Sequence, residues 1–260
     1  MNPRFLALTI SLSGLLLLPL VCLYSPGTRT IAKAYARISK QLLLKTKLGE
    51  MHQLSPEELK ELAQLITVKV FADPNIGSGI LIAKEAGVYQ VLTNAHVLTP
   101  GSLYRIQAPD GKIYQAKSVR ERDSWKGNDL ALLQFSSWQN YKIATLNKSE
   151  LKEEQKVLVA GFPLDSNQLV FTTGKVSLLT DKAVKGGYQI GYTNQTQQGM
   201  SGSPVFNEQG QVIGIHGLGS LPILNETYTY EDGSQPKAKV REKMRQLSFA
   251  IPIETFSQGN

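Results

Sequence analysis

The sequence predicts an all-β fold in which short strands alternate with turns, preceded by helical segments at the N-terminus. Hydrophobic residues make up 42% of the chain, and 22 glycines and 12 prolines are spread among them, as expected for many strands joined by turns. The apolar runs after residue 66 are short and bounded by polar or glycine-containing turns, which indicates strands. At 260 residues the chain is long enough for two small barrels or one large domain.

Residues 1–34 have the features of an export signal or a membrane anchor. Arg4 precedes an apolar run over residues 5–23, which is long for a signal peptide and marginal for a membrane span. The triplet Ala32-Lys33-Ala34 matches a small-x-small cleavage site, whereas the basic residues that follow the run argue against translocation. We expect export to the periplasm or the extracellular space, either released or associated with the membrane through this segment.

Residues 35–65 are expected to form a helical N-terminal segment. Its first part places apolar residues at helical spacing among lysines and arginines. Two interpretations remain open: an amphipathic helix on an anionic membrane or a propeptide, and a solvated basic helix packed loosely on the fold. Further on, Ser55, Pro56 and Glu58 form a capping box with proline at the first helical position. This pattern predicts a short structural helix that leads into the first strand.

Strands are expected from residue 67 onward. In the first half they are expected at residues 67–71, 79–82, 89–92, 104–107, 113–116 and 130–135. Gly87 lies in the turn after the second of these runs, and Asp110-Gly111 predicts a hairpin turn. In the second half strands are expected at residues 156–160, 169–173, 175–179, 188–192, 212–216 and 248–253.

Three short motifs carry residues suited to nucleophilic catalysis. Ser201 lies between Gly199-Met200 and Gly202, His96 follows the third strand, and Asp129 precedes the sixth. A serine hydroxyl is a weak nucleophile until a neighbouring base removes its proton, and histidine has a suitable pKa. A buried carboxylate can hold the imidazole in one tautomer. Glycines beside the serine allow a sharp turn and a close approach to a substrate.

These motifs, in the chain order His96, Asp129, Ser201, resemble the active site of the chymotrypsin-like serine proteases over residues 66–256. The order differs from that of subtilisins and α/β-hydrolases. The resemblance implies two six-stranded antiparallel β-barrels, at residues 66–150 and 151–260, with the active site in the cleft between them. It also implies peptide-bond hydrolysis through an acyl-enzyme on Ser201. The backbone amides of Gly199 and Ser201 would form the oxyanion hole.

The single cysteine, Cys22, narrows the comparison within that family. Because it lies in the leader, the catalytic region has no disulfide and no thiolate metal site. The bacterial members therefore fit best, namely the HtrA type without its PDZ domain and the glutamyl endopeptidases. Met200 stands where animal zymogens of the family carry an acidic residue, so that activation switch is not expected here. The resemblance implies no metal and no cofactor.

The resemblance also indicates which residues line the pocket for the side chain before the cleaved bond (P1). They are Gln195, Thr196, His216, Gly217, Leu218 and Gly219. In glutamyl endopeptidases the positions of Thr196 and His216 bind an acidic P1 side chain, and a hydroxyl and an imidazole can do so by charge-assisted hydrogen bonds. We therefore expect a preference for Glu or Asp. The alternative is that His216 merely fills the second barrel.

A long insertion separates the pocket strand from the last strand, at residues 220–247. Such a length exceeds what a tight barrel connection needs. Its second half has five basic residues on an expected helix, namely Lys237, Lys239, Arg241, Lys243 and Arg245. It could act as a lid, as an exosite for acidic substrates, or as a solvated surface insertion.

The formal net charge is +7, but the sequence contains no nucleic-acid-binding motif. Three of the basic residues lie in the first 34 positions, which contain no acidic residue. We therefore expect no nucleic-acid partner. The expected protein is a monomer that acts on polypeptides. A catalytically silent module that binds peptides or a protein partner on the same fold is the alternative.

Overall fold

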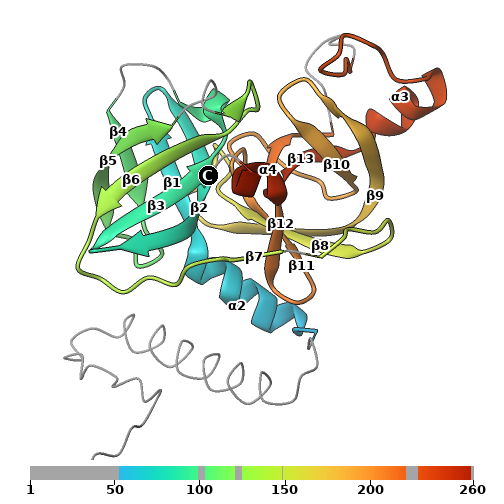
Figure 1. Cartoon of the computed structure of the whole chain (residues 1–260). Coiled ribbons are helices and arrows are strands. Elements are labelled where there is room, and N and C mark those ends of the chain that lie inside the picture. The colour runs from blue at the N-terminus through green and yellow to red at the C-terminus, as the bar shows by residue number, and fades with distance from the viewer. Residues whose placement is uncertain (1–52, 99–102, 121–124, 148, 221–227, 259–260) are drawn as a thin grey trace, which may run out of the picture.

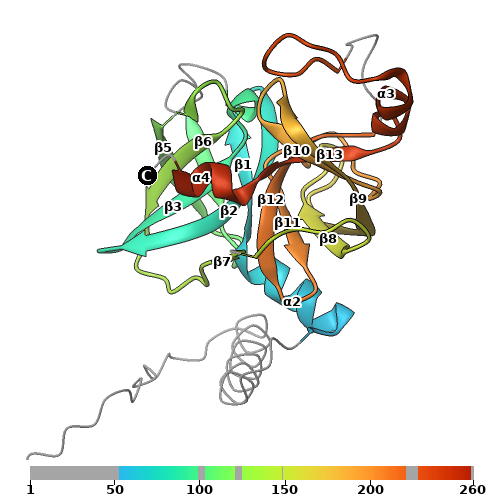
Figure 2. The same cartoon turned by 45° about the vertical axis from the view of Figure 1, so that its right-hand side comes forward.

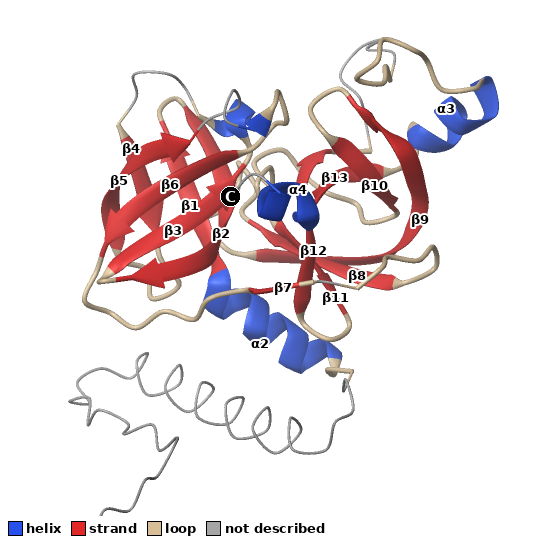
Figure 3. Cartoon of the chain, viewed as in Figure 1, coloured by secondary structure: helices blue, strands red, loops and turns tan. Residues whose placement is uncertain are grey.

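The computed structural model describes residues 53–98, 103–120, 125–147, 149–220 and 228–258. Figure 1 shows two β-barrels side by side, with helix α2 below them and the C-terminal helix α4 at their junction. Strands dominate both halves (Figure 3). The expected leader and the basic part of the N-terminal segment lie outside the described residues. Within the described ranges, no helix is long and apolar enough to cross a membrane.

The first barrel contains six antiparallel strands and is closed in the order β1-β2-β3-β6-β5-β4. Its strands are β1 (Thr67–Ala72), β2 (Asn75–Glu85), β3 (Val88–Thr93), β4 (Tyr104–Gln107), β5 (Ile113–Arg120) and β6 (Ala131–Ser136). The interior is filled by aliphatic and aromatic side chains that include Val70, Leu81, Val91 and Leu133. Closure leaves no unpaired edge strand in this barrel, so it presents no open edge to another chain.

The second barrel contains six strands in the order β11-β8-β9-β10-β13-β12, and pairing of β11 with β12 closes it. The strands are β8 (Lys156–Gly161), β9 (Val170–Val184), β10 (Tyr188–Tyr192), β11 (Pro204–Asn207), β12 (Gln211–Leu218) and β13 (Ser248–Pro252). A short strand, β7 (Thr145–Leu146), adds to the outside of β12 in parallel. The predicted fold of two six-stranded antiparallel barrels is confirmed.

One strand prediction in the second barrel is wrong. Separate strands were expected at 169–173 and 175–179, with a break at Gly174, but β9 is continuous from Val170 to Val184. Gly174 pairs with Val157 in the ladder instead of making a turn. A Cβ on Gly174 would lie 2.3 Å from Oδ1 of Asn194, so glycine here permits a close approach of the chain.

Helix α2 (Pro56–Ile66) forms where the capping box predicts it. The Glu58 backbone N–H donates to Ser55 Oγ at 3.2 Å, and the Ser55 backbone N–H donates to Glu58 Oε2 at 2.9 Å. The helix buries Leu59, Leu62, Ala63 and Ile66. The chain enters β1 directly at Thr67, as expected.

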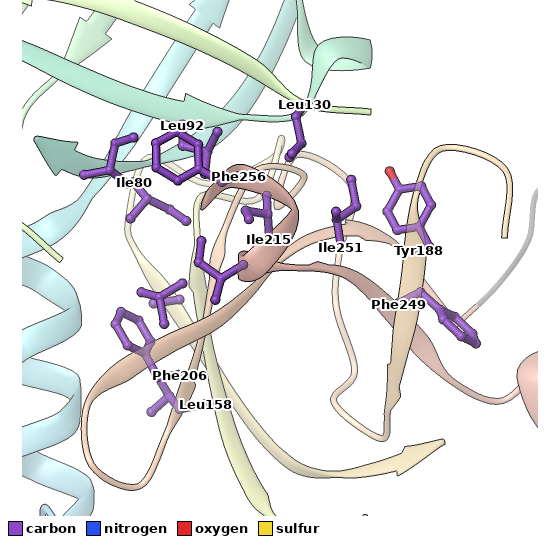
Figure 4. Close-up of a cluster of buried hydrophobic side chains, with 14 of the residues drawn as sticks. Ile80, Leu92, Leu130, Leu158, Tyr188, Phe206, Ile215, Phe249, Ile251 and Phe256 are labelled. Atoms are coloured by element: carbon purple, nitrogen blue, oxygen red, sulfur yellow. The ribbon is translucent and has the colours of Figure 1, made fainter. Parts of the chain in front are cut away.

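A shared hydrophobic cluster joins the two barrels (Figure 4). Ile80, Leu92 and Leu130 come from the first barrel, and they share this cluster with side chains of the second. Phe256 of α4 (Ile253–Gln258) belongs to the same cluster, and Figure 4 shows it among these side chains. Burying one such side chain contributes about 1.5–3 kcal/mol. The cluster therefore holds the two barrels together as one unit. Figure 2 shows the two barrels from a second direction.

Candidate active site

His96 lies on a short 3₁₀ helix, η1 (Ala95–Val97), that follows β3 directly. The next residue, Val97, is buried in the first barrel. Its side chain packs on Gly77 so closely that a Cβ there would lie 2.6 Å from Val97 Cγ1. The His96 side chain itself stays 41% exposed. This turn therefore presents the imidazole at the surface on a backbone anchored in the core.

Asp129 contacts His96 through both of its carboxylate oxygens. The imidazole Nδ1 lies 2.5 Å from Asp129 Oδ2, and the His96 backbone N–H donates to Oδ1 at 2.9 Å. The Asp129 carbonyl in turn accepts from the Asn94 side-chain amide at 2.9 Å and from the Ala95 N–H at 3.3 Å. The η1 turn and the segment before β6 are thus fastened together by four hydrogen bonds. This arrangement orients the ring and makes Nδ1 the protonated nitrogen.

The Asp129 carboxylate is buried and stays ionised at neutral pH. Burial alone would raise the pKa of Asp129, but hydrogen bonds from His96 and Tyr188 and the charge of His96 outweigh it and lower this pKa to about 2. The Tyr188 hydroxyl donates to Oδ2 at 2.5 Å. Asp129 can therefore stabilise a positive charge on the imidazole.

Ser201 lies on a loop that docks against the first barrel. Its carbonyl accepts from the Ser78 N–H of β2 at 2.7 Å. A Cβ on the following Gly202 would lie 2.0 Å from the Ser78 carbonyl oxygen and 2.3 Å from Oγ1 of Thr93. Since Thr93 ends β3 just before His96, the serine loop is held beside the histidine turn. Only glycine at position 202 allows this approach.

The peptide between Gln198 and Gly199 has a defined orientation. The Gln198 carbonyl accepts from the Leu164 N–H at 2.8 Å, and in a trans peptide the following N–H points the opposite way. Gly199 has a φ of 93°, a left-handed conformation that favours glycine. Within the described part of the chain, the amides of Gly199 and Ser201 donate to no other backbone group. Both donors are therefore available to a bound anion.

The expected pocket residues gather around the start of β13. Thr196 Oγ1 lies 3.0 Å from Ser248 Oγ, and it would lie 3.5 Å from a Cβ on Gly219, so Thr196 and Gly219 face each other. Gln195 is exposed, and its side-chain oxygen accepts from Ser220 Oγ at 3.5 Å. Leu218 pairs with Phe249 in the sheet.

His216 is buried in the second barrel and held in a neutral form. Its Nδ1 lies 2.6 Å from the hydroxyl of Tyr192. Burial, together with the charge of His96, lowers the pKa of His216 to about 3, although a backbone hydrogen bond to Phe249 opposes this. Among the described residues, no hydrogen bond joins Thr196 to His216. Thr196 contacts Ser248, and His216 bonds to the backbone of the next residue, Phe249.

Tyr188 is the residue at this site that the sequence motifs missed. It starts β10, and its hydroxyl reaches Asp129 from the second barrel. Gly217 makes room for it, because a Cβ there would lie 2.3 Å from the Tyr188 oxygen. The chain has ten tyrosines, and no local pattern distinguishes this one. The one signal in the sequence is Gly217, because a glycine in a strand can mark a place where another group packs against the backbone.

The described residues include no group of three or more His, Cys, Asp or Glu side chains that could hold a metal ion.

A family model for the trypsin-like peptidase domain matches residues 77–215. The serine protease HTRA1 of Xenopus tropicalis is 31% identical over 153 residues, which cover 55% of this chain and 31% of that protein. The glutamyl endopeptidase of Staphylococcus aureus (strain MW2) is 30% identical over 195 residues, which cover 67% of this chain and 56% of that protein. The chain thus spans about a third to just over half of these relatives.

Among solved structures, the crystal structure of the serine endoprotease from Yersinia pestis matches with a TM-score of 0.59 and 21% identity. The match covers 80% of this chain and 65% of that chain. At this identity it supports the fold alone, and it agrees with the two barrels described above.

Proposed function

Because the chain belongs to the trypsin-like peptidase family, we propose that it is a serine endopeptidase with Ser201 as its nucleophile. The resemblance expected from the motifs is confirmed at the level of the family. The observation that carries the proposal is the double contact of His96 with the buried Asp129. The loop of Ser201 docks on Ser78 and Thr93 beside the histidine turn, which supports the assignment of a base, its orienting carboxylate and a hydroxyl to one site.

In the proposed reaction, His96 Nε2 takes the Ser201 hydroxyl proton as Oγ attacks the scissile carbonyl carbon. Asp129 stabilises the imidazolium that forms. The same proton then passes to the departing amine, which leaves an ester between Ser201 and the acyl part of the substrate. Water next gives a proton to His96 and its hydroxide to the acyl carbon. Return of the proton to Oγ releases the acid and restores Ser201.

The amides of Gly199 and Ser201 are proposed to bind the oxyanion of the tetrahedral intermediate. Support comes from the Gln198 carbonyl, which is tied to Leu164 and so directs the Gly199 N–H to the other side of the peptide. Oxyanion donors of this kind are worth about 10²–10³ in kcat.

A preference for acidic P1 residues is the finer part of the proposal. If the Tyr192 hydroxyl donates to His216 Nδ1, the proton of the neutral ring is on Nε2. Because the buried ring also makes a hydrogen bond to the Phe249 backbone, a P1 carboxylate would have to take the place of this backbone contact. Thr196, which faces Gly219 and contacts Ser248, would supply a hydroxyl to the same carboxylate. One relative with 30% identity is named a glutamyl endopeptidase, which is consistent with this assignment.

The test is cleavage of a mixed peptide library by the full chain beside its Ser201→Ala variant. Cuts that follow Glu or Asp and depend on Ser201 would support both the mechanism and the acidic pocket. Ser201-dependent cuts after other residues would retain the peptidase and reject the acidic preference. If neither protein cuts, the silent peptide-binding module becomes the better assignment, and retention of uncut peptides on the immobilised chain would identify it.

A further inference from the structure

The tip of the β9–β10 hairpin reaches across from the second barrel to Asp129. The Asp129 N–H donates to the Gly186 carbonyl at 2.8 Å, while Tyr188 binds the carboxylate. Gly187 packs so tightly that a Cβ there would lie 2.3 Å from Asn128 Oδ1. Both the backbone and the side chain of Asp129 are therefore positioned by this hairpin as well as by the histidine turn.

The hairpin tip is itself held by the insertion between β12 and β13. The Lys185 N–H donates to the Thr229 carbonyl and the Glu231 N–H to the Ala183 carbonyl, both at 2.9 Å. A β-bridge joins Val184 to Tyr230. Residues 228–234, which we call the clamp segment, thus extend the hairpin by one short antiparallel pairing.

The Glu231 side chain makes the closest contact of the clamp segment with the tip. Its Oε1 accepts from the Gly186 N–H at 2.6 Å, and the carbonyl of the same Gly186 accepts from the Asp129 N–H. Gly186 has a φ of 91°, a conformation that glycine adopts readily but other residues rarely do. One glycine therefore links Glu231 on one side to Asp129 on the other.

The clamp segment is anchored at its base in the second barrel. Tyr228 is buried, its hydroxyl donates to the Met244 carbonyl at 3.0 Å, and its ring lies 5.7 Å from that of Phe249. Met244 ends α3 (Ala238–Met244) and is fully buried. Figure 1 shows the described part of the insertion, in orange-red, beside the outer end of β9 and β10. These contacts fix the clamp segment to the second barrel at its base.

We propose that the clamp segment positions Asp129 for catalysis through the hairpin tip, with Glu231 as its key positioning residue. This inference rests on the proposed peptidase function. It assigns the clamp segment a role distinct from a lid or an exosite, because this segment pairs with the hairpin tip through Thr229, Tyr230 and Glu231. Glu231 holds the Lys185–Gly186 peptide, whereas the carbonyl that accepts from Asp129 belongs to the next peptide, whose Gly187 N–H donates to the Val184 carbonyl at 2.9 Å. Loss of the Glu231 acceptor therefore frees the first of these two peptides, loosens Gly186 between them and weakens the hydrogen bond from the Asp129 N–H.

The test compares three variants of the full chain. Glu231→Ala removes the acceptor, Glu231→Gln keeps a side-chain oxygen, and Glu242→Ala is a matched control on exposed α3. We expect Glu231→Ala to lower kcat about fivefold to tenfold, the size of one lost hydrogen bond, with KM within about twofold because no pocket residue changes. Glu231→Gln should stay within about twofold of the wild type, and Glu242→Ala should match it.

Amide hydrogen exchange supplies a readout that does not depend on activity. Peptides covering residues 125–133 should exchange faster in Glu231→Ala than in the wild type, and not in Glu242→Ala. Unchanged exchange in these peptides would overturn the proposal that the clamp segment positions Asp129. So would an unchanged kcat in an enzyme whose cleavage depends on Ser201. If the wild type shows no such cleavage, the proposed function fails. The exchange comparison alone then decides whether the clamp segment positions Asp129.

Discussion

Replacing Tyr188 by phenylalanine tests how much of the Asp129 environment comes from the second barrel. The change removes one hydroxyl that donates to Oδ2 at 2.5 Å. Phenylalanine fills the same space, so no cavity forms. The carboxylate keeps its two hydrogen bonds from His96 and loses the one from Tyr188.

The size of the effect follows from the pKa of Asp129. Its decrease from the ordinary 3.8 to about 2 corresponds to about 2 kcal/mol of stabilisation of the ionised carboxylate. The hydrogen bond from Tyr188 is one of the interactions that lower this pKa, and the net contribution of one hydrogen bond is about 1 kcal/mol. We therefore expect Tyr188→Phe to reduce the free energy of unfolding by about 1 kcal/mol at pH 7. A similar loss of imidazolium stabilisation would lower kcat about fivefold.

The assay is urea unfolding in a Ser201→Ala background, which prevents self-cleavage, beside kcat and KM of the single variant. The matched control is Tyr89→Phe, because Tyr89 is also fully buried and its hydroxyl donates to the Gln139 carbonyl at 2.7 Å, far from Asp129 in the first barrel. Both variants should lose stability, but only Tyr188→Phe should lose kcat. Equal kcat in the two variants would refute the reasoning.

Three further predictions concern acid stability, the oxyanion loop and the pocket. Because the pKa of Asp129 is lowered in the folded state, this carboxylate contributes about 2 kcal/mol to the free energy of unfolding above pH ~5. The contribution is lost as pH falls through 3.8 toward 2. Between pH 5 and pH 3, the free energy of unfolding measured with urea should therefore fall less in Asp129→Asn than in the wild type. Gly199→Ala should cost about 1–2 kcal/mol and lower kcat at least about a hundredfold, since a Cβ would lie 2.5 Å from the Leu164 nitrogen; circular dichroism and steady-state kinetics would check this. Thr196→Val should reduce kcat/KM for a Glu substrate about tenfold relative to a matched Gln substrate.

Each of these has a contrary result. Identical pH dependence in Asp129→Asn would mean that the carboxylate is not the group that titrates. A folded Gly199→Ala variant with full activity would remove this amide from the oxyanion hole. Equal losses on Glu and Gln substrates in Thr196→Val would show that the hydroxyl does not read the charge.

Much of the local structure was predictable because its causes lie within a few residues. The capping box of Ser55 and Glu58 predicts α2, and Asp110-Gly111 predicts the turn in which the Gly111 N–H donates to the Ala108 carbonyl. The strand at 188–192 was expected with the bounds that the structure has, Tyr188–Tyr192. By contrast, the role of Gly174 depends on Asn194, twenty positions away, so the break expected in β9 was wrong.

The sequence by itself determined the family, the two-barrel fold and the residues proposed for catalysis, because serine between glycines, histidine and aspartate have distinctive chemistry in a distinctive order. Only the tertiary structure decided what surrounds them. Tyr188 and Gly186 meet Asp129 across the barrel junction, and Glu231 reaches Gly186 from an insertion. Such contacts depend on how two barrels pack, which results from many weak contacts between distant segments that no local pattern contains.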